Sequence, residues 1–131
     1  MYRRSSEVSD GHPYPLLMSL KLRARTTGKL EIDGKLRRQL ALAGRMRQMQ
    51  ATANPPIDAP WCMFDLAEVR LYAGDSAGFL EWTRKGLEES QNDFEPQTFR
   101  SALQLLIDGG VAPAGLGEAL PLIDARVAEL Q

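Results

Sequence analysis

The sequence contains few side chains that could carry out acid–base, nucleophilic or metal chemistry. His12 is the only histidine and Cys62 the only cysteine in the 131 residues. A nucleophilic site needs a nucleophile, a base and a group that orients the base, all close in space. His12 lies in a polar N-terminal segment, and Cys62 lies on an apolar stripe, where cysteine behaves as a small hydrophobic side chain. We therefore expect no catalytic or metal-binding role for His12 and a place in the core for Cys62.

Carboxylates are the remaining candidates for chemistry. Asp65 and Glu68 are three residues apart in one expected helix, and Glu81 and Glu88 are seven apart in the next. Such spacings bind metals in four-helix bundles, but that motif also needs a histidine three residues after a glutamate, which is absent here. We interpret both pairs as solvated faces. No lysine follows the glycines of residues 74–78, so a phosphate-binding loop is also absent.

These observations predict no enzyme, no cofactor and no metal site. An enzyme that uses carboxylates alone is the weakest of three hypotheses about function. The two stronger ones concern binding.

Basic side chains are concentrated in the N-terminal part of the chain. Residues 1–52 hold eleven basic and four acidic side chains, whereas residues 53–131 hold five basic and thirteen acidic ones. The net charge of −1 therefore hides two parts of opposite charge. Such a division affects which partners bind, and it allows one half to dock on the other within the fold or in a second copy.

The candidate partner-binding residues come from the basic helix expected over 35–52 and from the helix after it. A tryptophan at a helix start beside a proline-rich loop can serve as an exposed anchor for a protein. Basic side chains can also meet phosphates, but this helix carries no aromatic residue on which bases could stack, and the pI is 5.8. The predicted binding residues are Arg37, Arg38, Arg45, Arg47 and Trp61.

Apolar residues recur every three to four positions along most of the chain after residue 12, which is the pattern of amphipathic helices. No segment alternates apolar and polar residues for long enough to form a sheet. Proline inside a helix costs about 3 kcal/mol, so we expect a break at Pro121 and a last helix that begins near Leu120. Short connections predict that successive helices are antiparallel neighbours. The earlier helices are predicted over about 16–25, 35–52, 61–73, 77–90 and 96–108.

The helix expected over 61–73 is apolar around most of its circumference, with a narrow polar edge formed by Asp65, Glu68 and Tyr72. Such a helix is packed between two neighbours. In the following helix, Gly86 costs about 1 kcal/mol relative to alanine. We expect close approach of another helix at Gly86 to compensate for that cost.

Residues 63–87 resemble one tetratricopeptide repeat, a helix–turn–helix unit of about 34 residues. Leu66-Ala67, Gly74-Asp75 and Gly86-Leu87 stand at the spacings of that pattern. The resemblance implies stacked antiparallel helical hairpins, a tetratricopeptide-like α–α superhelix, with an exposed groove for protein partners. More loosely, the whole layout looks like the helical-repeat regions attached to bacterial signalling and defence proteins.

Two positions depart from the repeat pattern. Arg70 stands where the family favours tyrosine, and Phe79 stands where it favours alanine. A bulky phenylalanine at that position is expected to open the hairpin.

We accordingly expect an all-α fold of about six helices, with residues 1–12 as a disordered or loosely docked arm and residues 13–131 as a single helical-repeat domain. The leading hypothesis is a protein–protein interaction module, a scaffold or regulatory subunit of a larger assembly, whose partner is another protein or a second copy. The alternative is a nucleic-acid-binding helical domain that uses the basic N-terminal half. No apolar run suits a membrane span or a secretion signal, so we expect no membrane partner and a cytoplasmic location. We infer no small-molecule substrate.

Overall fold

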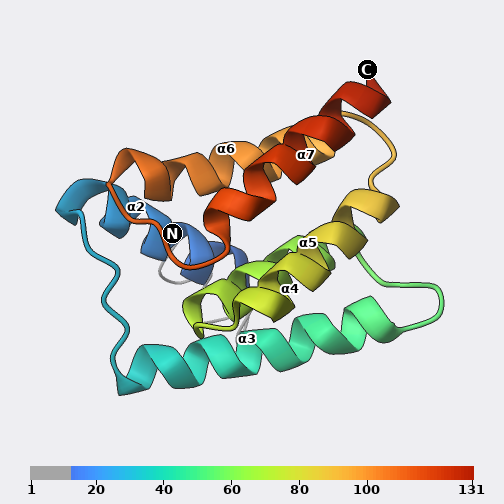
Figure 1. Ribbon diagram of the computed structural model, residues 1–131. Coiled ribbons are helices and arrows are strands. Elements are labelled where there is room, and N and C mark those ends of the chain that lie inside the picture. The colour runs from blue at the N-terminus through green and yellow to red at the C-terminus, as the bar shows by residue number, and fades with distance from the viewer. Residues whose placement is uncertain (1–12) are drawn as a thin grey trace.

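A computed structural model describes residues 13–131, and within them the chain is all-α (Figure 1). This confirms the predicted fold class. The expected N-terminal arm and His12 lie outside the described residues. The six helices of the described part are α2 (Pro13–Thr27), α3 (Gly34–Thr52), α4 (Trp61–Tyr72), α5 (Ser76–Glu89), α6 (Phe94–Asp108) and α7 (Leu116–Leu130).

Local sequence signals explain where two of these helices begin. The side chain of Asp33 accepts a hydrogen bond of 2.8 Å from the backbone N–H of Leu36, which caps α3. The side chain of Asp75 accepts one of 2.9 Å from Gly78 and caps α5 in the same way. Gly74, just before this cap, has a φ of 81°. A residue in this left-handed conformation lets the chain turn sharply between α4 and α5.

Helix α4 is the centre of the molecule. It packs along α5 on one side and along α3 on the other, and it also contacts α2 (Figure 1). Nine of its twelve residues are buried. The prediction that this helix lies between neighbours is therefore confirmed.

The C-terminal helices stack on helices that lie earlier in the chain. Helix α7 packs against both α6 and α5, and α2 packs mainly against α6 (Figure 1). The prediction that successive helices are antiparallel neighbours is wrong for two pairs, because α2 contacts α3 only slightly and α5 contacts α6 even less. A Cβ on Gly109 would overlap the backbone carbonyl of Ala24, so a glycine is needed where α6 ends against α2.

Aromatic rings fill the core between α4, α5 and α6. The rings of Phe64 and Phe99 are stacked with centroids 4.3 Å apart. A Cβ on Gly86 would lie 2.5 Å from the ring of Phe64, so the predicted close approach at this glycine is confirmed. Cys62 is fully buried, and burial raises the pKa of its thiol, as expected for a core cysteine.

Phe79 is fully buried without separating α4 from α5, which remain the most extensively packed pair of helices. Its ring lies next to Gly115, in the connection before α7. The expectation that Phe79 opens the hairpin is therefore wrong, because the ring packs against the connection that precedes α7.

The predicted break at Pro121 is also wrong. Helix α7 begins at Leu116 and continues through Pro121 to Leu130. The missing hydrogen bond falls on the carbonyl of Gly117, four residues earlier. Both Pro121 and Gly117 are exposed, so water can bind this carbonyl and lower the cost of the proline.

Candidate partner-binding surfaces

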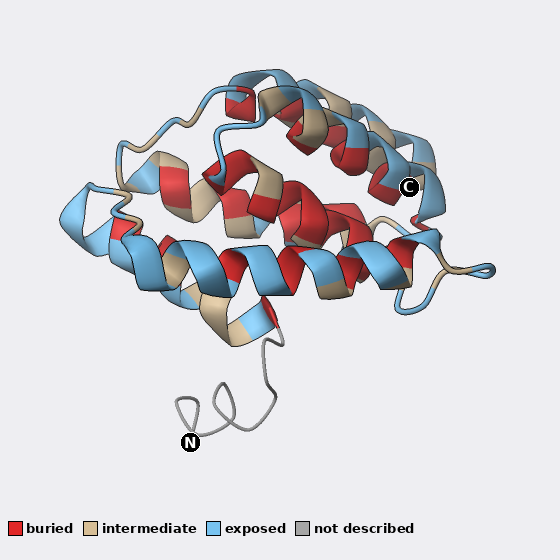
Figure 2. Cartoon of the chain, turned by 90° about the horizontal axis from the view of Figure 1, so that it is seen from below, coloured by how far each residue is buried: buried red, intermediate tan, exposed pale blue. Residues whose placement is uncertain are grey.

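Helix α3 lies at one edge of the molecule and turns one long face outward (Figure 2). Its buried residues, among them Leu40, Ala43 and Arg47, face the core. On the opposite side, positions spaced by four, three and four residues form a single exposed row. We call this row the α3 stripe; it consists of Arg38, Leu42, Arg45 and Met49.

The α3 stripe places two exposed apolar side chains beside two arginines. Leu42 is 47% exposed and Met49 is 75% exposed, although both are large apolar residues. The arginines beside them, Arg38 and Arg45, form no ion pair with any residue in 13–131. Helix α3 contains no acidic residue at all. The stripe is therefore an apolar surface with a positive charge that the described part of the fold does not neutralise.

Arg37 lies off this stripe, beside a small pocket between α3 and α4. The pocket has a volume of about 240 Å³, and its walls include Leu40, Val69 and the ring of Tyr72. Arg37 is exposed and has no ion pair within the described residues. Arg70, which also lines this pocket, donates a hydrogen bond of 3.0 Å to the side chain of Gln48.

Arg47 does not belong to the exposed surface, which corrects the prediction. Its side chain is 4% exposed, and its Nη2 lies 2.6 Å from a carboxylate oxygen of Asp65. Its Nη1 lies 2.8 Å from Asp58 and also donates to Gln50. Although burial acts in the opposite direction, Asp65 and Asp58 raise the pKa of Arg47, so it stays charged. Arg47 thus fastens α3 to α4 and to the connection between them.

A second buried ion pair joins α2 to α4. Lys21 Nζ donates to both carboxylate oxygens of Glu68, at 2.7 and 2.8 Å, and both side chains are almost fully buried. The hydroxyl of Tyr72 donates to the same carboxylate at 2.8 Å. Burial raises the pKa of Tyr72 well above its usual value, so its hydroxyl keeps the proton that it donates.

The interpretation of Asp65 and Glu68 as a solvated face is therefore wrong. Both carboxylates bind basic side chains inside the fold. The sequence carried a signal for this: a narrow polar edge on a helix packed between neighbours must find buried partners. Glu81 and Glu88 are exposed, as predicted.

Trp61 begins α4 and is only partly buried. Its ring meets the edge of Phe64 with centroids 6.1 Å apart. The ring of Trp61 thus contacts the core through Phe64. Trp61 belongs to α4 and is not part of the α3 stripe. The structure does not bring it together with Arg38 and Arg45 on one helix face.

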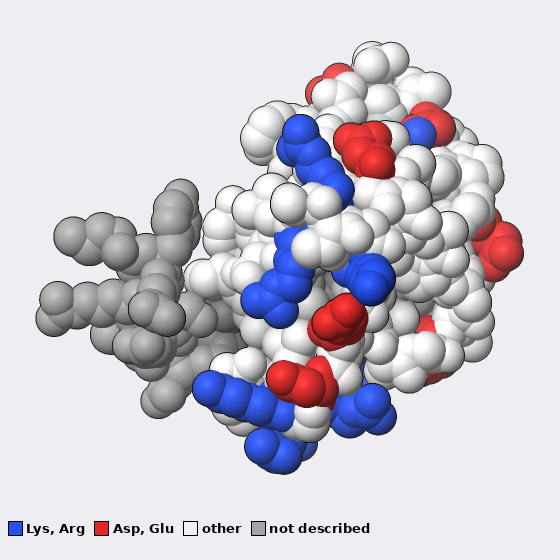
Figure 3. Space-filling model, turned by 90° about the vertical axis from the view of Figure 1, so that its left-hand side faces the viewer, with Lys and Arg blue, Asp and Glu red and all other residues white. Residues whose placement is uncertain are grey.

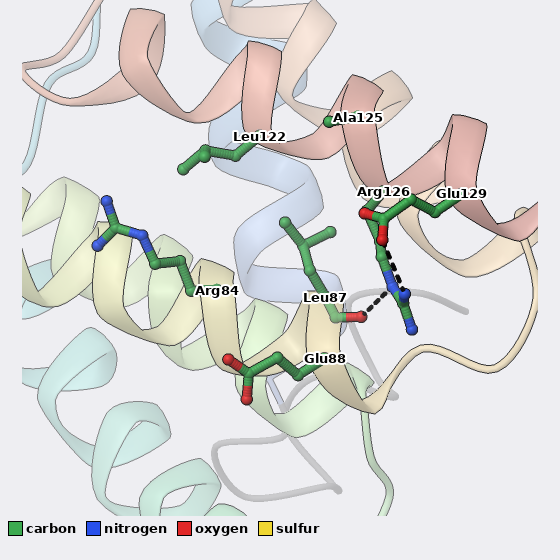
Figure 4. A pocket seen from close by; sticks show the side chains of 7 residues that line it. All are labelled: Arg84, Leu87, Glu88, Leu122, Ala125, Arg126 and Glu129. Carbon is green, nitrogen blue, oxygen red and sulfur yellow. Dashed lines mark hydrogen bonds and ion pairs between the residues drawn. The ribbon is translucent and has the colours of Figure 1, made fainter.

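A groove of about 450 Å³ lies between α5 and α7 (Figure 4). Its apolar floor is formed by Leu87, Leu122 and Ala125. Arg126 donates to the backbone carbonyls of Leu87 and Ser90, at 2.9 and 3.1 Å, and so ties α7 to the end of α5. The remaining charged residues of its lining are Arg84, Glu88 and Glu129.

Basic and acidic side chains alternate where α2 ends and α3 begins. Figure 3, which looks at this end of the molecule, shows blue and red side chains interspersed rather than one continuous blue area. The exposed residues there include Arg23, Lys29 and Lys35 together with Glu31 and Asp33. This end therefore lacks the unbroken row of positive charge that would track a nucleic-acid backbone.

No family model, curated protein or solved structure matches this chain. The likeness to a tetratricopeptide repeat thus depends on the pattern in residues 63–87 alone. Within residues 13–131, no three side chains of the metal-binding types lie close enough together to hold an ion. No helix among the described residues is long and apolar enough to cross a membrane.

Proposed function

We propose that this domain is a protein-interaction module and that the α3 stripe binds its partner. One observation carries the proposal: Leu42 and Met49 are exposed on a helix without acidic residues, beside Arg38 and Arg45, which have no ion pair in the described fold. Exposed large apolar side chains flanked by charge are typical of protein-binding sites. Arg38 and Arg45 favour a partner surface that carries carboxylates beside apolar residues.

The buried ion pairs support this role because they fix the position of α3. Arg47 binds Asp65 on α4 and Asp58 in the preceding connection, so the helix cannot rotate without breaking both contacts. A rigid helix presents its outer face at a lower cost in conformational entropy. Such a domain would act as a scaffold or regulatory subunit of a larger assembly, and we place that assembly in the cytoplasm.

Nucleic acid is the second candidate, since the four exposed cations of α3 could neutralise phosphates. Two observations favour protein instead. Exposed apolar Leu42 separates Arg38 from Arg45, and exposed apolar Met49 follows Arg45. The acidic side chains of Glu31 and Asp33 lie near the start of the same helix.

The test compares the partners captured by the immobilised domain from nuclease-treated host lysate. Two variants change the α3 stripe: R38E/R45E reverses its charge, and L42S/M49S removes its apolar part. A matched control, R23E/K29E, makes the same charge change at exposed positions outside the stripe. We expect a protein that the wild type and the control retain and that both stripe variants lose.

Two results would contradict this function. One is capture that survives both stripe variants unchanged. The other is loss of every captured protein after nuclease treatment, which would indicate that the α3 stripe binds nucleic acid instead. Unfolding curves of all variants that coincide with the wild type to within about 0.5 kcal/mol verify that only the surface changed.

A further inference from the structure

We propose that the groove between α5 and α7 receives the α3 stripe of a second copy of this chain. The inference rests on the proposed function, because it requires the α3 stripe to be a protein-binding surface. It goes further in naming the partner.

The groove is apolar where a helix would rest and polar along its sides. Leu87 and Leu122 project into the space between the two helices, and Ala125 leaves that space open (Figure 4). The guanidinium of Arg126 donates to two backbone carbonyls, and its Nη1 lies 3.8 Å from a carboxylate oxygen of Glu129. Apolar residues such as Leu42 and Met49 suit a floor of this kind, in the manner of a helix bound in a groove.

Charge makes α3 the complementary element. Helix α3 carries five basic residues and no acidic one. The two helices that form the groove, α5 and α7, together carry three basic and six acidic residues, and the groove lining itself holds two of each. Glu88 lines the groove and has no ion pair within the described residues. A basic helix that approaches this surface is therefore attracted to it, and the attraction is screened by salt.

One molecule cannot satisfy both surfaces by itself. Helix α3 lies at one edge, and α4 and α5 stand between it and α7 (Figure 1). A contact from the stripe of one copy to the groove of another joins two different surfaces, which makes it heterologous. Contacts of this kind leave a free stripe at one end and a free groove at the other, so they extend into chains unless a ring closes.

The first measurement is the mass of the wild-type protein by sedimentation equilibrium, at concentrations from about 0.01 to 1 mM. We expect a mass that rises with concentration at low salt and association at least about tenfold weaker at high salt. A wild type that stays monomeric at the highest concentration in low salt would overturn the inference.

The second measurement uses two variants that each lack one surface. R38E/R45E lacks a functional stripe, and E88R/A125R blocks the groove at two exposed positions. E89R/S101R makes the same change in charge at exposed positions outside the groove lining and serves as the control. Each surface variant alone should be a monomer, and an equimolar mixture should form a one-to-one complex. A mixture that stays monomeric, or a control that loses association, would refute the contact.

These outcomes separate the inference from the proposed function. If stripe variants lose a captured foreign protein while the wild type remains monomeric, the function stands and the inference fails. If the groove variant loses a foreign protein without any change in mass, the groove binds that protein instead of a second copy, and the inference again fails. If the stripe variants change neither capture nor mass, both fail.

Discussion

Lys21 and Glu68 are separated by 47 residues in the sequence, yet Nζ of the lysine lies 2.7 Å from one oxygen of the carboxylate. The pair joins α2 to the central helix α4, and both side chains are almost fully buried. Removing two charges from water is expensive, and only their mutual attraction and the hydrogen bond from Tyr72 compensate. The pair therefore fixes α2 against α4, and loss of one member should be costly.

Lys21→Met tests this relationship. The substitution leaves Glu68 buried without its counter-charge, and we expect the free energy of unfolding to fall by about 3–5 kcal/mol. Urea denaturation measures the change, with the exposed Lys29→Met as the control. The double variant K21M/E68Q should recover part of the loss, because the neutral amide still accepts from Tyr72. Equal effects of K21M and K29M would contradict the prediction.

Arg47→Met and Arg45→Met make the same chemical change two residues apart in α3. Arg47 holds Asp65 and Asp58, so its loss should cost about 3 kcal/mol of stability. Arg45 is exposed and has no ion pair within residues 13–131, so R45M should change stability by no more than about 0.5 kcal/mol. Chemical denaturation of both variants gives the comparison. Similar values for the two would show that Arg47 is not a structural anchor.

Gly86→Ala should destabilise the protein even though alanine favours a helix. Its Cβ would lie 2.5 Å from the ring of Phe64, which is itself stacked on Phe99. Overpacking of this kind costs about 1–3 kcal/mol and exceeds the gain in helix propensity of about 1 kcal/mol. Gly117→Ala is the control, because nothing lies within 4 Å of a Cβ there, and it should stabilise by about 0.5 kcal/mol. Thermal unfolding of both variants decides whether their signs are opposite.

The stability should depend on pH through Asp65. Burial raises the pKa of Asp65 to about 6, although Arg47 opposes the shift. Since the folded-state pKa lies above the usual value, the protonated form favours folding, and this contribution is lost as the pH rises through about 6.

Asp65→Asn supplies the reference for this effect, because the amide does not titrate. The free energy of unfolding of the wild type minus that of D65N should decrease by about 1–3 kcal/mol between pH 4 and pH 7. Titrations that occur in both proteins cancel in this difference. A difference that stays flat or increases with pH would show that the carboxylate is stabilised in its charged form.

The sequence was sufficient to place α2 to α6 to within about three residues, because the relevant signals are local, whereas the start of α7 was predicted too late. Apolar residues every three to four positions mark one face of a helix, and capping residues such as Asp33 and Asp75 act on N–H groups three residues away. Arg38 and Arg45 are seven residues apart, a spacing that puts both on one face of α3. The same local pattern also placed Cys62 and Gly86 against neighbouring helices.

The tertiary structure alone decided which charged residues are buried. Arg45 and Arg47 have the same chemistry and are two positions apart, but one is exposed and the other is buried against Asp65. Lys21 is buried because α2 packs near α4, and no local pattern specifies that contact. Pairing of a charge with a distant partner depends on how the helices meet, and the free energy of that packing comes from the whole core rather than from neighbours in the chain.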